Sequence, residues 1–163
     1  ATGLSAARRT LAAMANSGTA GYFGGGYQAD YVATVEKFLC SDDSSSTLGT
    51  GLSAARRYLA AMANSGTAGY FGGGNEATYV ATVDKFLFSN DSRTTLGTGL
   101  SSARLALGGM ADSGTAGYFG GGYTGSAVAT VDKFAFSDDS RTTLGTGLSS
   151  ALFYLAAMAN GNI

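Results

Sequence analysis

Three acidic loops carry the side chains of this sequence that come nearest to a metal site. They read SDDS at 41–44, SNDS at 89–92 and SDDS at 137–140. Calcium takes about six to eight oxygen ligands, whereas each loop offers at most two carboxylates and is followed by no distal glutamate. The loops therefore predict solvated turns, and calcium binding stays open as the alternative.

The sequence offers few residues suited to catalysis because the chain contains no histidine. A Ser-His-Asp triad, a histidine base or an imidazole metal site cannot be built without one. The stretch GYFGGG at 69–74 suggests a phosphate-cradling loop, but no Lys followed by Ser or Thr comes after it. We therefore expect no enzyme, no cofactor, and no catalytic, cofactor-binding or metal-binding residues.

One acidic and one basic residue stand next to each other in three equivalent places. These pairs are Glu36-Lys37, Asp84-Lys85 and Asp132-Lys133. In a strand, adjacent residues point to opposite faces. We expect structural ion pairs between these charges and Arg8, Arg56 or Arg104 of a neighbouring repeat.

A third set of candidates lies where otherwise similar stretches differ from one another. Loops on a rigid scaffold often carry recognition, and a tyrosine there could stack on a sugar. The candidate ligand loop comprises Tyr27, Gln28, Asp30, Asn75, Glu76, Tyr123 and Thr124. The alternative is neutral drift in an unselected loop.

These candidates are positioned by a repeat. The stretch GLSAARRYLAAMANSGTAGYFGGG at 51–74 has close copies that begin at Gly3 and Gly99, and a truncated copy at Gly147, so the period is 48 residues. A fixed period of this length indicates an array of similar units. We expect units at 3–50, 51–98 and 99–146, with a partial unit or docking strand at 147–163.

The second repeat predicts four strands. Aromatic and β-branched residues favour strands at 67–74 and 78–89, and a short one at 93–98. Segment 53–66 has helix-forming residues, but its third copy places Gly108-Gly109 inside the segment, which costs a helix about 2 kcal/mol. We therefore expect a strand there, with a helix at each SAARRYLAAMA segment as the alternative.

Four strands in 48 residues are typical of a propeller blade, since kelch units run about 50 residues. Each unit resembles a kelch blade: Arg56 and Arg104 precede the first strand, glycines in YFGGG end the second, and VDKF gives the aromatic-plus-acid third. The units are also similar to kelch-repeat arrays of bacteria and their phages. The resemblance implies an all-β fold of three four-stranded, kelch-like blades and a partial fourth.

Three blades cannot close a ring, because propellers need about four to eight. We therefore expect a homo-oligomer or neighbouring repeats of a longer chain. The last copy has Leu152 and Phe153 where two earlier copies have paired arginines, and terminal repeats commonly cap or dock. We expect Leu152, Phe153 and Ile163 to be buried at an assembly interface. Cys40 replaces Phe88 and Phe136 of the later copies, so we expect a buried small hydrophobe.

Charge and hydropathy restrict the partners. The net charge of −1 is spread along the repeats, which predicts no nucleic-acid partner, and no apolar run is long enough to predict a membrane span. We expect a structural repeat protein that assembles through blade packing, in an extracellular or virion-surface fibre or decoration. The alternative is an adhesion-type module that binds a glycan or a protein surface through its loops.

Overall fold

The computed structural model describes residues 3–112 and 114–156. Within these ranges the chain forms β-strands and no helix, so the all-β prediction is confirmed and the helix alternative is wrong. Segment 53–66 contains strand β5 (Ala60–Asn64), and the residues before it run as loop.

The strands form three four-stranded antiparallel sheets in chain order. The first sheet consists of β1 (Ala12–Asn16), β2 (Ala20–Gly24), β3 (Val35–Leu39) and β4 (Ser45–Thr47). The second consists of β5, β6 (Ala68–Gly72), β7 (Val83–Leu87) and β8 (Arg93–Thr95). The third consists of β9 (Gly108–Asp112), β10 (Ala116–Gly120), β11 (Val131–Ala135) and β12 (Arg141–Thr143).

The predicted strand at 78–89 is longer than the observed β7. Residues 80 and 81 leave the sheet because their carbonyls accept hydrogen bonds from the next repeat, from Arg104 N and Leu100 N respectively. Within β7, residues on both faces are buried, as expected for a strand covered on both sides.

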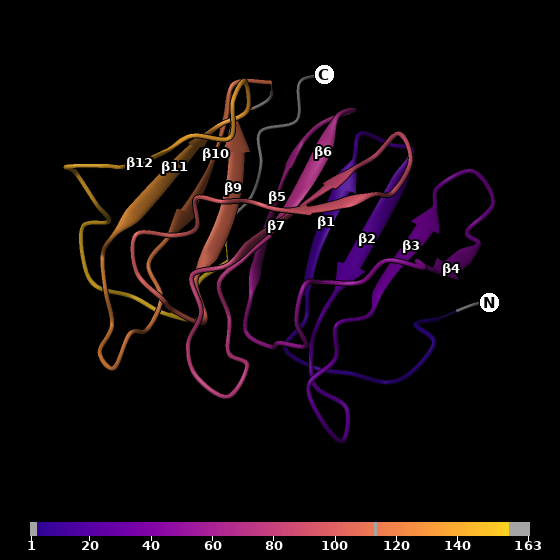
Figure 1. Cartoon of the computed structure of the whole chain (residues 1–163), viewed down its shortest axis with the longest axis horizontal. Helices are drawn as coiled ribbons and strands as arrows, with labels where there is room; N and C mark the ends of the chain where they lie inside the picture. The colour runs from indigo at the N-terminus through magenta and orange to yellow at the C-terminus, as the bar shows by residue number, and fades with distance from the viewer. Residues whose placement is uncertain (1–2, 113, 157–163) are drawn as a thin grey trace.

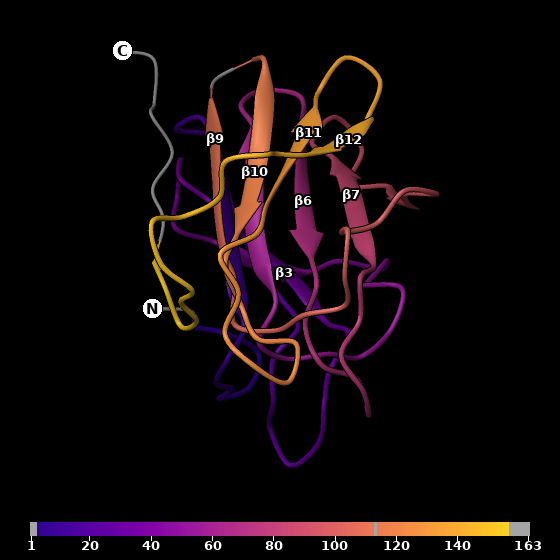
Figure 2. The same cartoon turned by 90° about the vertical axis from the view of Figure 1, so that its left-hand side faces the viewer.

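The sheets fan out from their first strands. β1, β5 and β9 lie side by side, and the remaining strands of each sheet extend away from them (Figure 1). Figure 2 shows this order within the third sheet, from β9 on the left to β12 on the right. Small residues are required at the centre because a Cβ added at Gly109 would collide with the carbonyl oxygen of Ala61.

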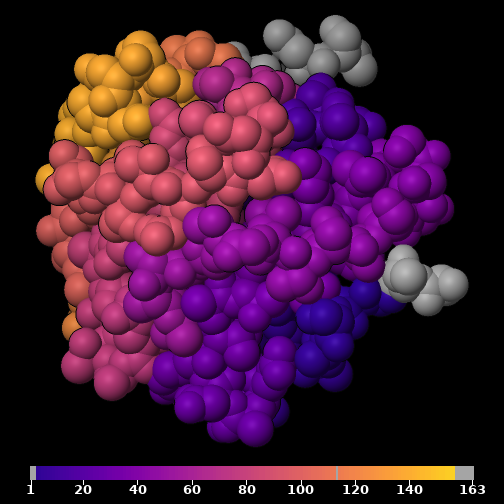
Figure 3. All heavy atoms as spheres, turned by 45° about the vertical axis from the view of Figure 1, so that its right-hand side comes forward, coloured from indigo at the N-terminus to yellow at the C-terminus, as the bar shows by residue number. Residues whose placement is uncertain are grey.

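The hydrophobic core lies between the sheets. One buried cluster joins the first and second sheets through residues such as Met14, Tyr22, Phe71 and Phe88, and an equivalent cluster joins the second and third. The units therefore appear as adjoining blocks in chain order in the space-filling view (Figure 3). Across the described residues the sheets form an open row, with no closed ring.

Part of the fourth copy is attached to the third unit. Leu148 N donates to the Ala129 carbonyl, and Gly122 N donates to the Leu152 carbonyl, each at 2.8 Å. In the part of the chain that the structure describes, no helix has the length and apolar character needed to cross a bilayer.

Candidate functional site

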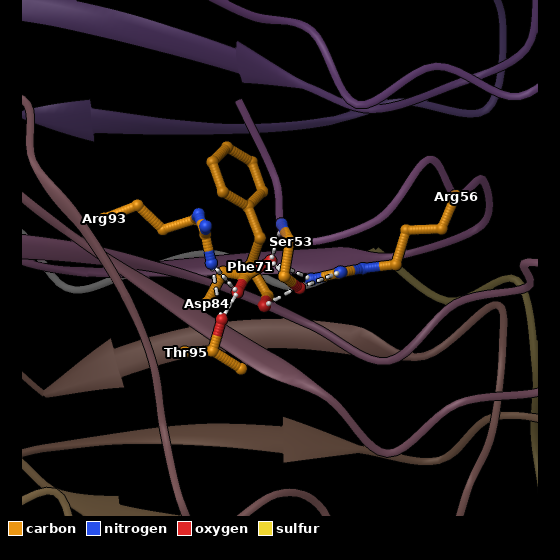
Figure 4. A network of polar contacts seen from close by, with 6 residues as sticks. All are labelled: Ser53, Arg56, Phe71, Asp84, Arg93 and Thr95. Atoms are coloured by element: carbon orange, nitrogen blue, oxygen red, sulfur yellow. Dashed lines mark hydrogen bonds and ion pairs between the residues drawn. The ribbon is translucent and has the colours of Figure 1, made fainter. Parts of the chain in front are cut away.

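A buried ionic network holds each unit together, and Figure 4 shows that of the second unit. Oδ2 of Asp84 accepts hydrogen bonds from Ser53 N, Ser53 Oγ and Arg56 Nη2, each at 2.9 Å. Its Oδ1 accepts from Thr95 Oγ1 at 2.6 Å, and Arg93 approaches the same oxygen at 3.5 Å. The Arg56 and Asp84 side chains are both 0% exposed, so this carboxylate is enclosed by protein groups.

The surroundings of Asp84 favour its charged form. Burial raises the pKa of the Asp84 carboxyl, but the hydrogen bond from Thr95 and the charge of Arg56 outweigh burial and hold that pKa below its usual range. Burial also lowers the pKa of the Arg56 guanidinium, while Asp84 opposes this effect. An arginine remains cationic at neutral pH, so the pair is an ion pair that stabilises the unit.

The buried ion pair at the centre of this network recurs in the other two units. Arg8 pairs with Glu36 and Arg104 with Asp132, each at 2.9 Å and buried. The predicted ion pairs therefore exist, but the prediction that the arginine comes from a neighbouring repeat is wrong. The partners lie in one unit because Ser53 and Arg56, in the segment before the first strand, reach Asp84 on the third strand of their own sheet. The backbone of this segment bonds to the preceding repeat.

A second set of polar contacts joins consecutive units. Lys37 Nζ and Tyr22 OH both reach Asp91 of the next unit, each at 2.8 Å. The second junction repeats this arrangement with Lys85, Tyr70 and Asp139, at 2.7 and 2.8 Å. Burial, followed by the hydrogen bond to the aspartate, raises the pKa of both tyrosines. Asp91 and Asp139 therefore each anchor their unit to the unit before it.

Apolar contacts at the same junctions require glycine. The Phe71 ring lies where a Cβ on Gly24 would be, with its Cζ 2.6 Å from that position, and Met14 lies in the same way over Gly69. Phe119 on Gly72 and Met62 on Gly117 repeat these contacts at the second junction. Each junction therefore interlocks, because a bulky side chain of one sheet fills the space above a glycine of the other.

Among the residues that the structure describes, the outer faces of the row lack this cover. Met110 is 44% exposed, whereas its counterparts Met14 and Met62 are 8% and 3% exposed. Cys40 is also exposed, so the prediction that it is buried is wrong. Its counterpart Phe88 is covered by Tyr22 of the preceding sheet, and no sheet precedes the first one in the described ranges.

The acidic loops form turns. Oδ1 of Asp42, Asn90 and Asp138 accepts a hydrogen bond from the backbone N–H two residues on, at 3.0 Å in each loop. The serine hydrogen bonds lower the pKa of Asp42 and Asp138. Among the described residues, no group of three or more Cys, Asp or Glu side chains gathers in a metal-binding arrangement.

The candidate ligand loops lie beside an arginine that the sequence prediction omitted. The Arg57 guanidinium carbon is 5.1 Å from the ring centroid of Tyr27 and 5.0 Å from that of Tyr31. Arg9 lies 5.0 Å from Tyr27 as well, and Tyr31 OH donates to Asn75 Oδ1 at 3.0 Å. The sequence signal for this contact was the repeated arginine pair, as in Arg56-Arg57. The first arginine of the pair binds the carboxylate inside the unit, so the second is available for another contact.

The remaining predicted loop residues lie at three separate tips. Gln28, Glu76 and Thr124 each donate a backbone N–H to the carbonyl two residues on. Asp30 is exposed and accepts the N–H of Tyr31. Tyr123 contacts Tyr79 of the preceding unit and Phe153 of the last copy. Tyr27 and Asn75 are thus linked through Tyr31, which contacts the Tyr27 ring and donates to Asn75. Tyr123 lies instead with the C-terminal segment.

Two of the predicted assembly residues are at the surface. Leu152 is 48% and Phe153 44% exposed, and the Phe153 ring lies 5.4 Å from Tyr123 and 5.1 Å from Tyr154. Leu152 stands in the fourth copy where Arg56 stands in the second. The Leu152 carbonyl accepts a hydrogen bond from Gly122 N, as the Arg56 carbonyl does from Gly26 N. Ile163 lies outside the described residues.

No protein-family model matches this chain. No curated protein matches it either.

A row of backbone hydrogen bonds also links the repeats. Tyr58 N donates to the Thr10 carbonyl, Ala106 N to that of Tyr58, and Tyr154 N to that of Ala106, at 2.8–2.9 Å. All four residues have φ between 55° and 58°, in the left-handed region that non-glycine residues rarely adopt. A cavity of about 250 Å³ lies along this row. The row ties the fourth copy to the units before it.

Proposed function

We propose that this chain is a non-enzymatic structural repeat protein that assembles through the packing of its blade-like units. The supporting observation is the contrast between Met62, which is 3% exposed inside the row, and Met110, which is 44% exposed at its end. A side chain that is covered at the inner junctions and uncovered at the end of the described row supports a role of the end face in further packing. Asp91 and Asp139 serve the same end, because each joins its unit to the unit before it.

The setting that we propose is an extracellular or virion-surface fibre or decoration made of kelch-like blades. Its support is the resemblance of the repeats to kelch arrays of bacteria and phages. Sedimentation velocity over a wide concentration range tests the assembly. We expect species heavier than the 16.3 kDa chain, and a single species of that mass at every concentration would contradict the proposal.

The terminal copy gives a residue-level test of the same function. Phe153→Asp introduces a charge on the exposed ring that contacts Tyr123, and we expect it to change the mass of the assembled particle. Ser150→Asp is the matched control, because it adds the same charge at an exposed position nearby. An unchanged particle mass in Phe153→Asp would remove this residue from the interface.

A second candidate function is binding of a glycan or a protein surface by the loops. The observation that favours it is the cluster of Tyr27, Tyr31, Arg9 and Arg57 at one end of the sheets, because aromatic and arginine side chains are enriched at recognition surfaces. Tyr27→Ala and Tyr123→Ala should lower retention on immobilised glycans and leave the assembly mass unchanged. Equal retention of both variants and the parent would exclude this function.

A further inference from the structure

The two outer faces of the row carry the same interlocking groups as the inner junctions. We propose that a second copy of this chain docks head to tail, with its first sheet on the third sheet of its neighbour. This inference rests on the proposed assembly function and names the partner and the surfaces. Its basis is continuity with an interface that the structure contains twice.

The first matching contact is between a phenylalanine ring and a glycine. At the inner junctions the ring of the later sheet lies over the glycine of the earlier one, as Phe71 does over Gly24. On the outer faces the corresponding residues are Phe23, which is half-buried, and Gly120. A Cβ added at Gly120 would make ordinary van der Waals contacts with Val131 at 3.6 Å and Leu148 at 3.8 Å. No aromatic ring of the described residues lies within 4 Å of this position, so it is left for a ring of a second copy.

The second matching contact is between a methionine and a glycine. Met14 fills the space over Gly69 in the next sheet. The equivalent methionine of the third sheet, Met110, is 44% exposed, and a Cβ added at Gly21 of the first sheet would meet only Phe23, at 4.0 Å. The methionine and the empty space thus lie on opposite ends of one molecule, which suits a head-to-tail contact and not a symmetric one.

The third contact is weaker than its inner counterparts. Tyr22 stacks on Phe88 with ring centroids 5.1 Å apart, and Tyr70 stacks on Phe136 at 5.5 Å. Across the proposed interface Tyr118 would meet Cys40, which has no ring to stack. The junction between copies is therefore looser than the junctions within a chain, which suits reversible association.

Residues 148–155 already occupy one edge of this interface. Leu148 and Leu155 lie beside Gly121 as the second repeat's Leu52 and Leu59 lie beside Gly25. A docking copy brings its own residues 4–11 to the same place, so the terminal segment must yield. Arg8 stays with Glu36 through its 2.9 Å ion pair, whereas Leu152 carries no charge to hold its segment. The terminal segment is thus a replaceable cover of the docking face.

Gly120→Ala tests the docking face by sedimentation equilibrium on the full chain. The added methyl has room in one molecule but would collide with Phe23 of a second copy, so we expect association about tenfold weaker with an unchanged unfolding midpoint. Gly145→Ala is the control, because a Cβ there meets nothing within 4 Å. Unchanged association of Gly120→Ala in a protein that still assembles would overturn the named surfaces and leave the proposed function standing.

Cys40→Phe tests the same interface by strengthening it. The new ring would stack on Tyr118, so we expect association several-fold tighter, with the gain lost in Cys40→Phe/Tyr118→Ala. Ser41→Phe is the control for nonspecific attraction, because it adds a ring at the neighbouring exposed position. A gain that persists without Tyr118 would overturn the proposed contact.

Leu155→Ala tests the replaceable cover. It weakens the attachment of the terminal segment without changing either sheet face. A second copy should then displace the segment more easily, so we expect tighter association. Weaker association would overturn the proposal that the docking copy replaces this segment. If the parent chain and all variants stay monomeric at every concentration, both the proposed function and this inference fail.

Discussion

The second and third sheets contain the same strand sequence and differ in how much of it is buried. β6 and β10 both read AGYFG, yet every residue of β6 is buried, while Tyr118 and Gly120 of β10 are partly exposed. The difference comes from the neighbour, because the third sheet covers the second. Burial of the interlocking residues is therefore a property of the junction, whereas the ionic network belongs to the unit.

The largest expected effect concerns the network and should be alike in both sheets. Asp84→Ala and Asp132→Ala each leave a buried arginine without its partner, which costs about 3–5 kcal/mol, since both carboxylates are 0% exposed. Urea unfolding measures the loss. The exposed Asp30→Ala is the control and should change the free energy of unfolding much less. A large cost for Asp84 alone would contradict a network contained within each unit.

The methionines should separate the two sheets. Met62→Ala opens a cavity at the inner junction and should cost about 2–5 kcal/mol. Met110→Ala removes an exposed side chain and should change the free energy of unfolding by less than about 0.5 kcal/mol in the monomer. Both are measured by urea unfolding at a concentration below that of association. Equal losses in the free energy of unfolding for the two variants would contradict the difference in burial between the two sheets.

Substitutions that enlarge a glycine should show the same contrast between the second and third sheets as those that shorten a methionine. Gly72→Ala places a methyl against Phe119, whose Cζ would be 2.6 Å away, so overpacking should cost about 1–3 kcal/mol. Gly120→Ala has space and should stay within about 0.5 kcal/mol of the parent. Thermal unfolding of the two variants distinguishes them, and a destabilised Gly120→Ala monomer would be the contrary result.

The smallest effect is a pH dependence of the inner junction. Burial raises the pKa of Tyr70 above its ordinary value near 10, so its contribution of about 1 kcal/mol is complete below pH 10 and is lost as the pH rises further. Tyr70→Phe should therefore show a shallower loss of stability than the parent above about pH 10. Parallel curves for the two proteins would contradict this.

The sequence was sufficient for the repeat and its strands. The 48-residue period predicted a repeated set of four strands, and Gly108-Gly109 correctly argued against a helix because interior glycines oppose one. Each strand predicted in the second repeat contains an observed strand, although the observed ones are shorter. Strand ends depend on hydrogen bonds to the next repeat, such as Leu100 N to the Ala81 carbonyl, which local residue preferences do not encode.

The partners of the charged residues and the fate of Cys40 needed the tertiary structure. The residues that pair, Arg56 and Asp84, were both identified, but whether they share a unit depends on how the loop before β5 directs its side chains toward β7. The role of Arg57 against Tyr27 was missed, because the two belong to different repeats.

The sequence by itself determined an all-β repeat with charged positions at regular spacing, because strand preference and periodicity are local properties. Only the tertiary structure decided which copies of the same residue are buried. Met62 and Met110 occupy equivalent positions, and stacking of the sheets covers the first and exposes the second. Burial depends on whether another sheet packs against the residue. The local sequence is nearly the same in each repeat, so it does not indicate which repeat has such a neighbour.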